Sequence, residues 1–187
     1  MSRIVWALCA FVIAATPVVA IANHSPNFAR PEAFRHAVNP FIGDASFIDR
    51  FGTPPPPGTD PWLRVSTHLS FVHDVLSRRD ASALTPQQRD ARRENLARLR
   101  EYIDAGVFPL NERYRDQNRP CFIDDDGRIC AVGYLVEQSA GRAVAERINT
   151  TFQYAFLSQM ASPEIDEWIA SSGLSRLELS LIQPCYD

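Results

Sequence analysis

The sequence predicts a mainly α-helical protein, with a single compact multi-helix domain of five or six helices and one short β-hairpin. Apolar residues recur at spacings of three and four, and helix-capping residues stand where these stretches begin. Two short apolar pairs flank an Asp-Gly sequence, which predicts the hairpin. The predicted boundaries are 1–22 for a signal peptide, 23–61 for an irregular, proline-rich extension and 62–187 for the helical domain.

The first 22 residues have the pattern of a secretory signal peptide. A short positive start with Arg3 precedes an almost wholly apolar run from Ile4 to Val19, and small residues follow at Ala20 and Ala22. The run is shorter and more broken than the about 20 apolar residues of a comfortable membrane span. We therefore expect a periplasmic or secreted protein that does not span the membrane once the signal is cleaved.

Composition is that of one exported globular domain. Removal of the signal leaves about 165 residues, enough to bury a core. Hydrophobic residues make up 45% of the chain and the formal net charge is -3, so there is no basic excess of the kind that nucleic-acid binding requires. We expect no nucleic-acid partner and no cofactor; the expected partner is an unknown protein or envelope component.

The extension is expected to drape over the domain and to end in Pro54 to Pro57, a stiff spacer. Asp60 and Pro61 then predict the start of a helix that reaches about Arg78. Its apolar positions, which fall on one face, are Val65, Leu69, Val72 and Leu76.

A second helix begins after Thr85, where Gln88 completes a capping box, and reaches about Ala105 before Gly106. Leu96, Leu99, Tyr102 and Ile103 form its predicted buried stripe. Its many charged residues, Arg92 among them, are expected to face solvent. Residues 107–120 have no clear period and are expected to form an ordered loop.

The hairpin is predicted for the pairs Phe122-Ile123 and Ile129-Cys130, with the acidic cluster in the turn. An EF-hand is excluded because the ligand spacing fails and the twelfth position lacks a bidentate Glu. Helices are then expected at 131–139 and 142–149, from Ser162 to near Gly173, and after the capping box formed by Ser175 and Glu178.

Cys130 is the first candidate for chemistry, because it stands at the junction of a strand and a helix. Free N–H groups and the partial positive charge of a helix start lower the pKa of a thiol and make it nucleophilic. A cysteine nucleophile also needs a base. His68 is the candidate base because it falls inside the apolar arc of its helix, and Glu137 is a possible third member.

Each of these residues also has a structural interpretation. A buried His68 can simply bond to a backbone carbonyl. In an oxidising compartment, Cys130 can form a disulfide with Cys121, although the two are not directly opposite in the hairpin. Cys185 can join either of them, and a buried free thiol is the third alternative for Cys130.

Four stretches carry a resemblance: HLSFVHDVL, REYIDAGVFPLN, RPCFIDDDGRICAVGYLVEQSAGR and WIASSGLSRLELSLIQPCY. Together they resemble a family of uncharacterised exported bacterial proteins, over roughly Val65 to Tyr186 and most specifically over Ile129 to Val136. The resemblance implies a bacterial, exported origin and names no activity. It also implies a role for Cys130 that needs neither Cys121 nor Cys185, and it leaves a Cys121–Cys185 pair as a local addition.

Two functions from different classes follow from the sequence. The first is an exported domain with a structural or binding role at the cell envelope or outside the cell. The alternative is a cysteine-dependent hydrolase or transferase that uses Cys130 as nucleophile and His68 as base.

Overall fold

The computed structural model describes residues 36–115 and 117–186, and this part of the chain is mainly helical. The predicted signal peptide and the first part of the extension lie outside the described residues. The helices of the described part are α1 (Ala45–Phe51), α2 (Pro61–Ser77), α3 (Pro86–Ala105), α4 (Ala131–Ala140), α5 (Arg142–Phe152), the short 3-10 helix η2 (Leu157–Gln159), α6 (Pro163–Ser172) and α7 (Arg176–Ile182). None of the described helices is both long and apolar enough to cross a membrane.

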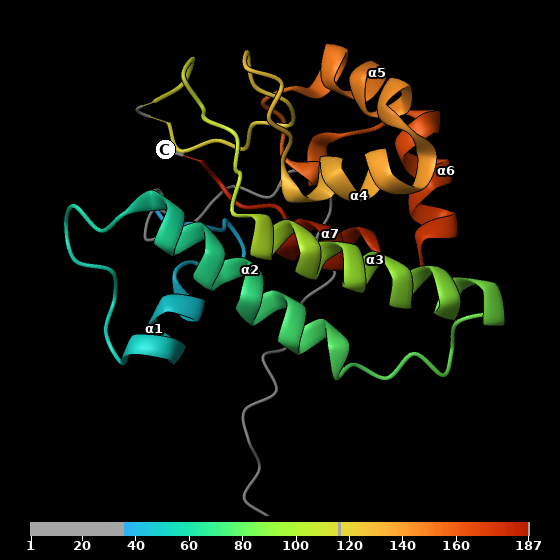
Figure 1. Ribbon diagram of the computed structural model, residues 1–187, viewed down its shortest axis with the longest axis horizontal. Helices are drawn as coiled ribbons and strands as arrows, with labels where there is room; N and C mark the ends of the chain where they lie inside the picture. The colour runs from blue at the N-terminus through green and yellow to red at the C-terminus, as the bar shows by residue number, and fades with distance from the viewer. Residues whose placement is uncertain (1–35, 116, 187) are drawn as a thin grey trace, which may run out of the picture.

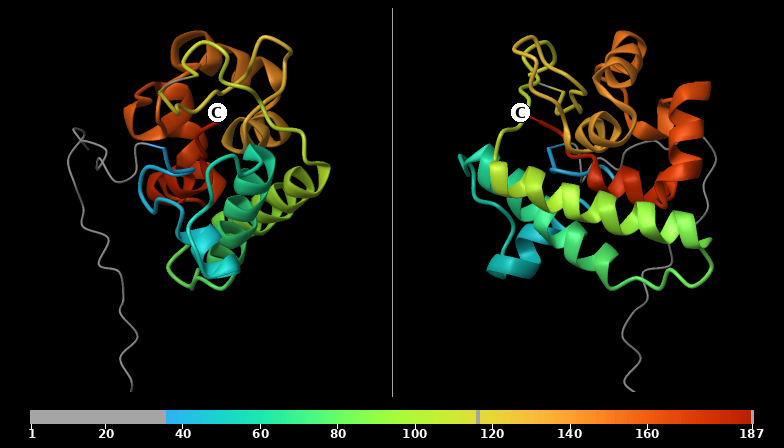
Figure 2. Two further views of the ribbon diagram at one scale, coloured as in Figure 1. Left: turned by 90° about the vertical axis from the view of Figure 1, so that its left-hand side faces the viewer. Right: turned by 45° about the vertical axis from the view of Figure 1, so that its right-hand side comes forward.

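The long helices α2 and α3 lie side by side and antiparallel, and the remaining helices pack around this pair (Figure 1). Helices α4, α5 and α6 lie on one side of it, and α3 contacts both α4 and α6. Helix α7 passes behind α3 and contacts α2 and α4, as the turned views in Figure 2 make clear. The core therefore lies between the α2–α3 pair, α4 and α7.

Helix α2 confirms the predicted start and the predicted apolar face. The Asp60 carboxylate accepts a hydrogen bond from the Trp62 N–H at 3.0 Å, and Pro61 occupies the first turn. The buried apolar positions are those of the predicted stripe: Val65, Leu69, Val72 and Leu76.

Helix α3 confirms its capping box and most of its stripe, but the prediction for Arg92 is wrong. Arg92 is buried, and its guanidinium donates to the Glu178 carboxylate at 2.9 Å and to the carbonyls of Leu76 and Gly173. The pattern of α3 alone cannot reveal this, because the partners come from α2, the turn after α6, and α7. Leu96 is half-buried, and the fully buried stripe is Leu99, Tyr102 and Ile103.

Residues 37–47 of the extension pack into the fold, and the prediction of an irregular segment is wrong for α1. Asn39 is completely buried, and its amide nitrogen donates to the carbonyls of Ser180, Leu181 and Gln183 at 3.0 to 3.2 Å. Its amide oxygen accepts from two N–H groups of the following turn. One side chain thus satisfies carbonyls that the end of α7 leaves without helical partners.

The predicted hairpin arms meet in one isolated antiparallel bridge, Ile123 with Ile129, and do not form extended strands. Asp124 organises the turn. Its buried carboxylate accepts from the N–H groups of Asp126 and Arg128 and from the Arg128 side chain at 2.6 Å. It also accepts from the Leu110 N–H, at 3.0 Å, which ties the preceding loop to the turn.

The C-terminal helices follow the predicted order. The capping box after α6 is present, because the Ser175 hydroxyl accepts from the Glu178 N–H and the Glu178 carboxylate accepts from the Ser175 N–H at 2.8 Å. Helix α5 runs to Phe152, one turn longer than the sequence predicts.

Candidate functional site

Cys130 lies where the sequence predicts, at the N-cap of α4. Its backbone is extended, its N–H donates to the Phe122 carbonyl at 2.8 Å, and its sulfur accepts from the Gly133 N–H at 3.3 Å. Gly133 is required at this point because a Cβ there would come within 2.6 Å of the Ile129 side chain. The CAVGYL stretch is thus a compact junction in which the thiol caps the helix and Ile129 packs on the glycine.

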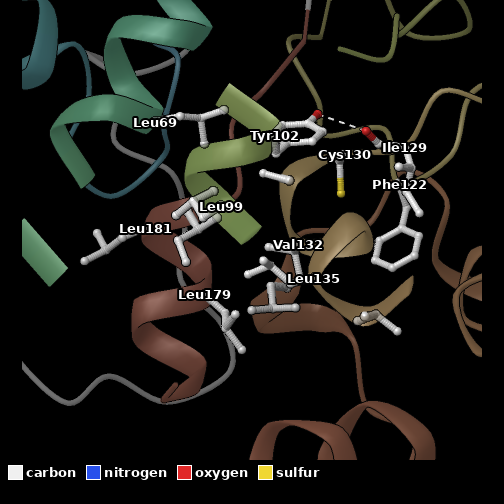
Figure 3. Close-up of a cluster of buried hydrophobic side chains, with 14 of the residues drawn as sticks. Leu69, Leu99, Tyr102, Phe122, Ile129, Cys130, Val132, Leu135, Leu179 and Leu181 are labelled. Atoms are coloured by element: carbon white, nitrogen blue, oxygen red, sulfur yellow. Dashed lines mark hydrogen bonds between the residues drawn. The ribbon is translucent and has the colours of Figure 1, made fainter. Parts of the chain in front are cut away.

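The thiol is sealed from solvent. Cys130 is 0% exposed, and Figure 3 shows its sulfur within the apolar cluster, between Tyr102 and Phe122. Burial raises the pKa of Cys130 to about 12, and the opposing N–H groups of Gly133 and Val132 do not offset it. The predicted lowering of the pKa by the helix start is therefore outweighed by desolvation.

His68 is also 0% exposed, and its ring is hydrogen-bonded to the last turn of another helix, α7. Its Nε2 lies 2.8 Å from the Leu181 carbonyl of α7, so Nε2 carries the hydrogen and donates it. Burial lowers the pKa of His68 to about 4, although the Leu181 carbonyl and the Asp44 carboxylate act in the opposite direction. The ring is neutral near pH 7, and its Nδ1 is buried without a hydrogen-bond partner.

The structure does not bring the three proposed catalytic groups into one hydrogen-bonded set. Within residues 36–115 and 117–186 the bonds of Cys130 and His68 lead to different elements, α4 and α7. Glu137 is half-buried and accepts from the Arg142 guanidinium at 3.0 Å, in an ion pair at the α4–α5 corner. His68 has the structural role, a bond to a backbone carbonyl, that the sequence left as an alternative to catalysis.

The predicted disulfide alternatives are wrong: across residues 36–115 and 117–186, no disulfide joins Cys121, Cys130 and Cys185. The register of the bridge explains the first pair. The Cys130 N–H bonds to the Phe122 carbonyl, so Cys130 stands opposite Phe122 and not opposite Cys121. Burial raises the pKa of Cys121 to about 12 as well, and the nearby Cys130 adds to the effect.

Two buried tyrosines from distant parts of the chain border the thiol. The Tyr102 hydroxyl of α3 donates to the Ile129 carbonyl at 2.9 Å (Figure 3). The Tyr186 hydroxyl, from the C-terminal tail, lies within reach of the Tyr102 hydroxyl and the Ala131 N–H, but makes no hydrogen bond of good geometry. Burial raises the pKa of both tyrosines well above the usual value.

An apolar recess opens next to these tyrosines, at the start of α2. Its enclosed volume is about 70 Å³, and about 460 Å³ when the part open to solvent is included. The lining comes from three segments that are distant in sequence: residues 61–65 of α2, residues 108–110 after α3, and Val38 with the C-terminal Cys185 and Tyr186. The exposed Trp62 ring, 36% accessible, stacks on Phe108 with 5.4 Å between ring centroids.

The recess is close to neutral, because the charge of Arg64 in its wall is balanced. The Arg64 guanidinium donates to the Asp44 carboxylate at 3.0 Å and to the His36 carbonyl at 2.7 Å. An apolar lining with few polar groups is the usual character of a small-molecule site. The enclosed space of about 70 Å³ lies below the usual range of about 300–1,000 Å³, so the recess can hold one flat group of a ligand and not a whole ligand of drug size. The recess can therefore bind a flat apolar group, which would pack against the Trp62 ring.

A second, wider depression lies between α3, α5 and α6, and its walls are charged. Arg98 pairs with Glu94 at 3.3 Å and Arg147 pairs with Glu164 at 3.2 Å. The Trp168 indole at its edge is buried and donates to the Ser139 hydroxyl. The four charged side chains named here already pair with one another, so none of the four is left to bind a ligand. We therefore take the apolar recess at the start of α2 as the candidate site. No group of three or more metal-ligating side chains gathers in the described residues.

The sequence carried one signal for the recess that our predictions did not use. Trp62 stands in the first turn of α2 at the edge of the apolar stripe, and its large ring nevertheless stays 36% accessible. Comparisons of the chain with protein-family models, curated proteins and solved structures gave no match.

Proposed function

We propose that this chain is an exported binding domain, and that the recess at the start of α2 holds a small, flat, apolar ligand at the cell envelope or outside the cell. The observation that carries the proposal is the exposed Trp62 ring, which stacks on the buried Phe108 in the wall of an apolar recess. Tryptophan offers a large contact area at little conformational cost, which suits it to a binding surface.

The state of the other candidate groups supports binding over catalysis. A nucleophilic thiol must ionise and reach its substrate, whereas Cys130 is sealed with a pKa of about 12. A general base must reach its proton donor, whereas His68 is turned to the Leu181 carbonyl. The recess needs neither group to be charged.

A titration with the neutral aromatic probe N-phenyl-1-naphthylamine tests the binding site. We expect saturable fluorescence with one probe per chain, and an affinity at least about tenfold weaker in Trp62→Ala, because truncating a central aromatic typically costs more than 1 kcal/mol. Val75→Ala is the matched control, since Val75 is an exposed apolar residue of the same helix, 45% accessible, outside the recess. Equal binding to both variants, or no saturation, would contradict the proposal.

Export is tested separately in the bacterial host. The signal pattern of residues 1–22 and the family resemblance support a processed protein. We expect the mature chain, with a mass that corresponds to cleavage near Ala22, in the periplasm or the medium. An intact chain in the cytosol would refute export while leaving the recess proposal to be judged by the titration.

A further inference from the structure

The loop between α1 and α2 presents a run of four prolines, residues 54–57, at the surface of the protein. Three of the four side chains are exposed, and that of Pro55 is half-buried. The loop is held at both ends, because the Gly52 N–H donates to the Ile48 carbonyl of α1 at 2.8 Å and Asp60 caps α2. Figure 1 shows the loop at the end of the molecule where α1 and the start of α2 lie. The proline run is therefore a fixed surface feature.

The proline run is stiff before it meets a partner. Each pyrrolidine ring fixes its own φ at about −65°. The run also ends in a tight turn, since Gly58 has a φ of +80° and the Thr59 N–H donates to the Pro56 carbonyl at 3.1 Å. A segment that is ordered in advance loses little conformational entropy on binding, and proline-rich segments of this kind bind in grooves lined by aromatic rings. The loop thus has the character of a ligand.

The recess has the complementary character. Its walls include Trp62, Phe108 and Tyr186, and its enclosed volume of about 70 Å³ suits a single ring of a longer segment. The proline run does not line the recess of its own chain, although the loop ends directly before Pro61 in the recess wall. The recess is close to neutral and residues 51–59 carry no charged side chain, so contact between the two removes no unpaired charge from water.

Exposed apolar side chains gather on the elements that flank the proline run and the recess. Ile48 and Phe51 of α1, Leu63 of α2 and Val107 after α3 are 42–55% exposed. Apart from Trp62, the other exposed large apolar side chain among the described residues is Val75, which lies toward the opposite end of α2. Apolar side chains that gather on one part of a surface mark an interaction site. This end of the molecule therefore has the character of a protein interface.

We propose that the partner is a second copy of this chain, and that the two copies exchange their proline runs, each run docking in the recess of the other copy. The inference rests on the recess of the proposed function and names a partner for it. The stiff run and the aromatic recess belong to one chain and lie at the same end of it, which favours a second copy over another proline-rich protein.

The positions of the two features define the geometry of the exchange. Both adjoin the start of α2, so a two-fold axis beside that helix start brings each run to the other recess. The assembly closes at two chains because both recesses are then filled. A prolyl ring packs against Trp62, and the exposed apolar side chains of α1 and α2 are buried with it. A small apolar ligand in the recess competes with the exchange.

Sedimentation equilibrium of the mature chain tests whether the dimer forms. The contact is small, so we expect weak association, with a weight-average mass that rises from one chain toward two between about 5 µM and about 500 µM. A mass of one chain over the whole range would overturn the proposal. A mass that grows beyond two chains would overturn it as well, because reciprocal exchange leaves no recess open for a third chain.

Two variants assign the contact to the proline run and the recess. The loop variant combines Pro54→Ser with Pro56→Ser, which removes two exposed rings and keeps the turn at Gly58. We expect the loop variant and Trp62→Ala each to weaken the dimer at least about tenfold. Pro86→Ser is the matched control, since this exposed proline starts α3 at the opposite end of the helix pair and should leave the dimer unchanged. Full dimer affinity in the loop variant would overturn the proposal.

Mixing the two weakened variants separates exchange between chains from damage to the fold. Trp62→Ala keeps an intact proline run and the loop variant keeps an intact recess, so a mixed dimer has one intact contact. We expect a labelled loop variant to form dimers when Trp62→Ala is added in excess, and not when unlabelled loop variant is added instead. Equal sedimentation in the two mixtures would refute docking between chains.

The same proteins distinguish this inference from the proposed function. Probe binding that is lost in Trp62→Ala, together with a parent chain that stays monomeric, would retain the binding site and refute the exchange. Parent dimers that need both the proline run and Trp62, together with no saturable probe binding, would retain the exchange and refute the small ligand. If both hold, N-phenyl-1-naphthylamine should shift the parent chain from dimer to monomer, because both occupy the recess.

Discussion

The two ends of the α2–α3 pair differ in whether their buried polar groups have hydrogen-bond partners. At the paired end, where α2 stops and α3 starts, Arg92 bonds to Glu178 and to two carbonyls, and each charge has a partner. At the recess end, which comprises the recess and the half of α2 next to it, His68 Nδ1 is buried without a partner and the Tyr186 hydroxyl makes no hydrogen bond of good geometry. A satisfied network fixes one packing arrangement, whereas an unsatisfied group marks a place where another arrangement costs little. The difference points to the paired end as scaffold and to the recess end as the place of function.

The largest effect should come from breaking the paired end. Burial raises the pKa of Glu178, but the hydrogen bonds from Arg92 and Ser175 outweigh it and the net pKa is lowered, so its charge depends on those partners. Arg92→Ala removes the buried cation from this carboxylate and leaves it the partly exposed Arg79 and the two Ser175 donors, and should cost about 3–5 kcal/mol of unfolding free energy in urea.

Arg93→Ala provides the control for that measurement. Arg93 is the next residue of α3, and its ion pair with Asp90 is exposed, so its loss should cost no more than about 0.5 kcal/mol. Similar losses for the two variants would remove the distinction between the two ends.

His68 should make the recess end sensitive to acid. Its folded pKa of about 4 lies below the unfolded value of 6.5, so the stabilisation is complete above pH 6.5 and is lost as the pH falls toward 4. The loss should reach about 3 kcal/mol between pH 7.5 and pH 4. Urea unfolding at several pH values measures it, and His68→Leu should abolish this component; an unchanged slope in that variant would contradict the assignment.

The turn before α4 should show an intermediate effect. Asp124→Ala removes the acceptor for three backbone N–H groups and the Arg128 side chain, with an expected cost of about 2–3 kcal/mol. The neighbouring Asp125 is exposed, and Asp125→Ala should fall within about 0.5 kcal/mol of the parent. Thermal unfolding of the Asp124→Ala and Asp125→Ala variants decides whether the buried Asp124 carboxylate, and not the acidic cluster as a whole, stabilises the turn before α4.

The smallest effect should come from the Tyr186 hydroxyl. Because this group makes no hydrogen bond of good geometry, Tyr186→Phe should leave the unfolding free energy within about 0.5 kcal/mol or raise it slightly. Tyr102→Phe is the contrasting variant, since it removes a 2.9 Å bond to the Ile129 carbonyl and should cost about 1 kcal/mol. A larger loss for Tyr186→Phe than for Tyr102→Phe would show that the recess end is as fully satisfied as the paired end.

The sequence predicted the elements whose signals are local. Asp60 and Ser175 mark helix starts through bonds to residues two or three positions away, and the α2 stripe depends only on helical spacing. Arg92 and Asn39 were missed for the opposite reason. The partners of the Arg92 guanidinium lie 16, 81 and 86 residues away, and the carbonyls that accept from the Asn39 amide nitrogen lie 141 to 144 residues away, so nothing in the local sequence distinguishes the two from surface residues.

The candidate site also has features that the local sequence predicted and features that it did not. The place of Cys130 at a helix start was predictable, because the turn and the helix pattern adjoin it. Its pKa was not, because the burial that raises it is produced only by the folded chain. The recess was not predictable either, since its walls come from three separate segments.

The rate at which iodoacetamide alkylates Cys130 in the native mature chain tests the central contrast between a sealed thiol and an open recess most directly. With a pKa of about 12 and no exposed surface, Cys130 should react at least about 1,000-fold more slowly at pH 7.5 in the native protein than in urea. Alkylation of native Cys130 as fast as a free thiol, slowed by His68→Ala, would contradict the account and restore the cysteine enzyme.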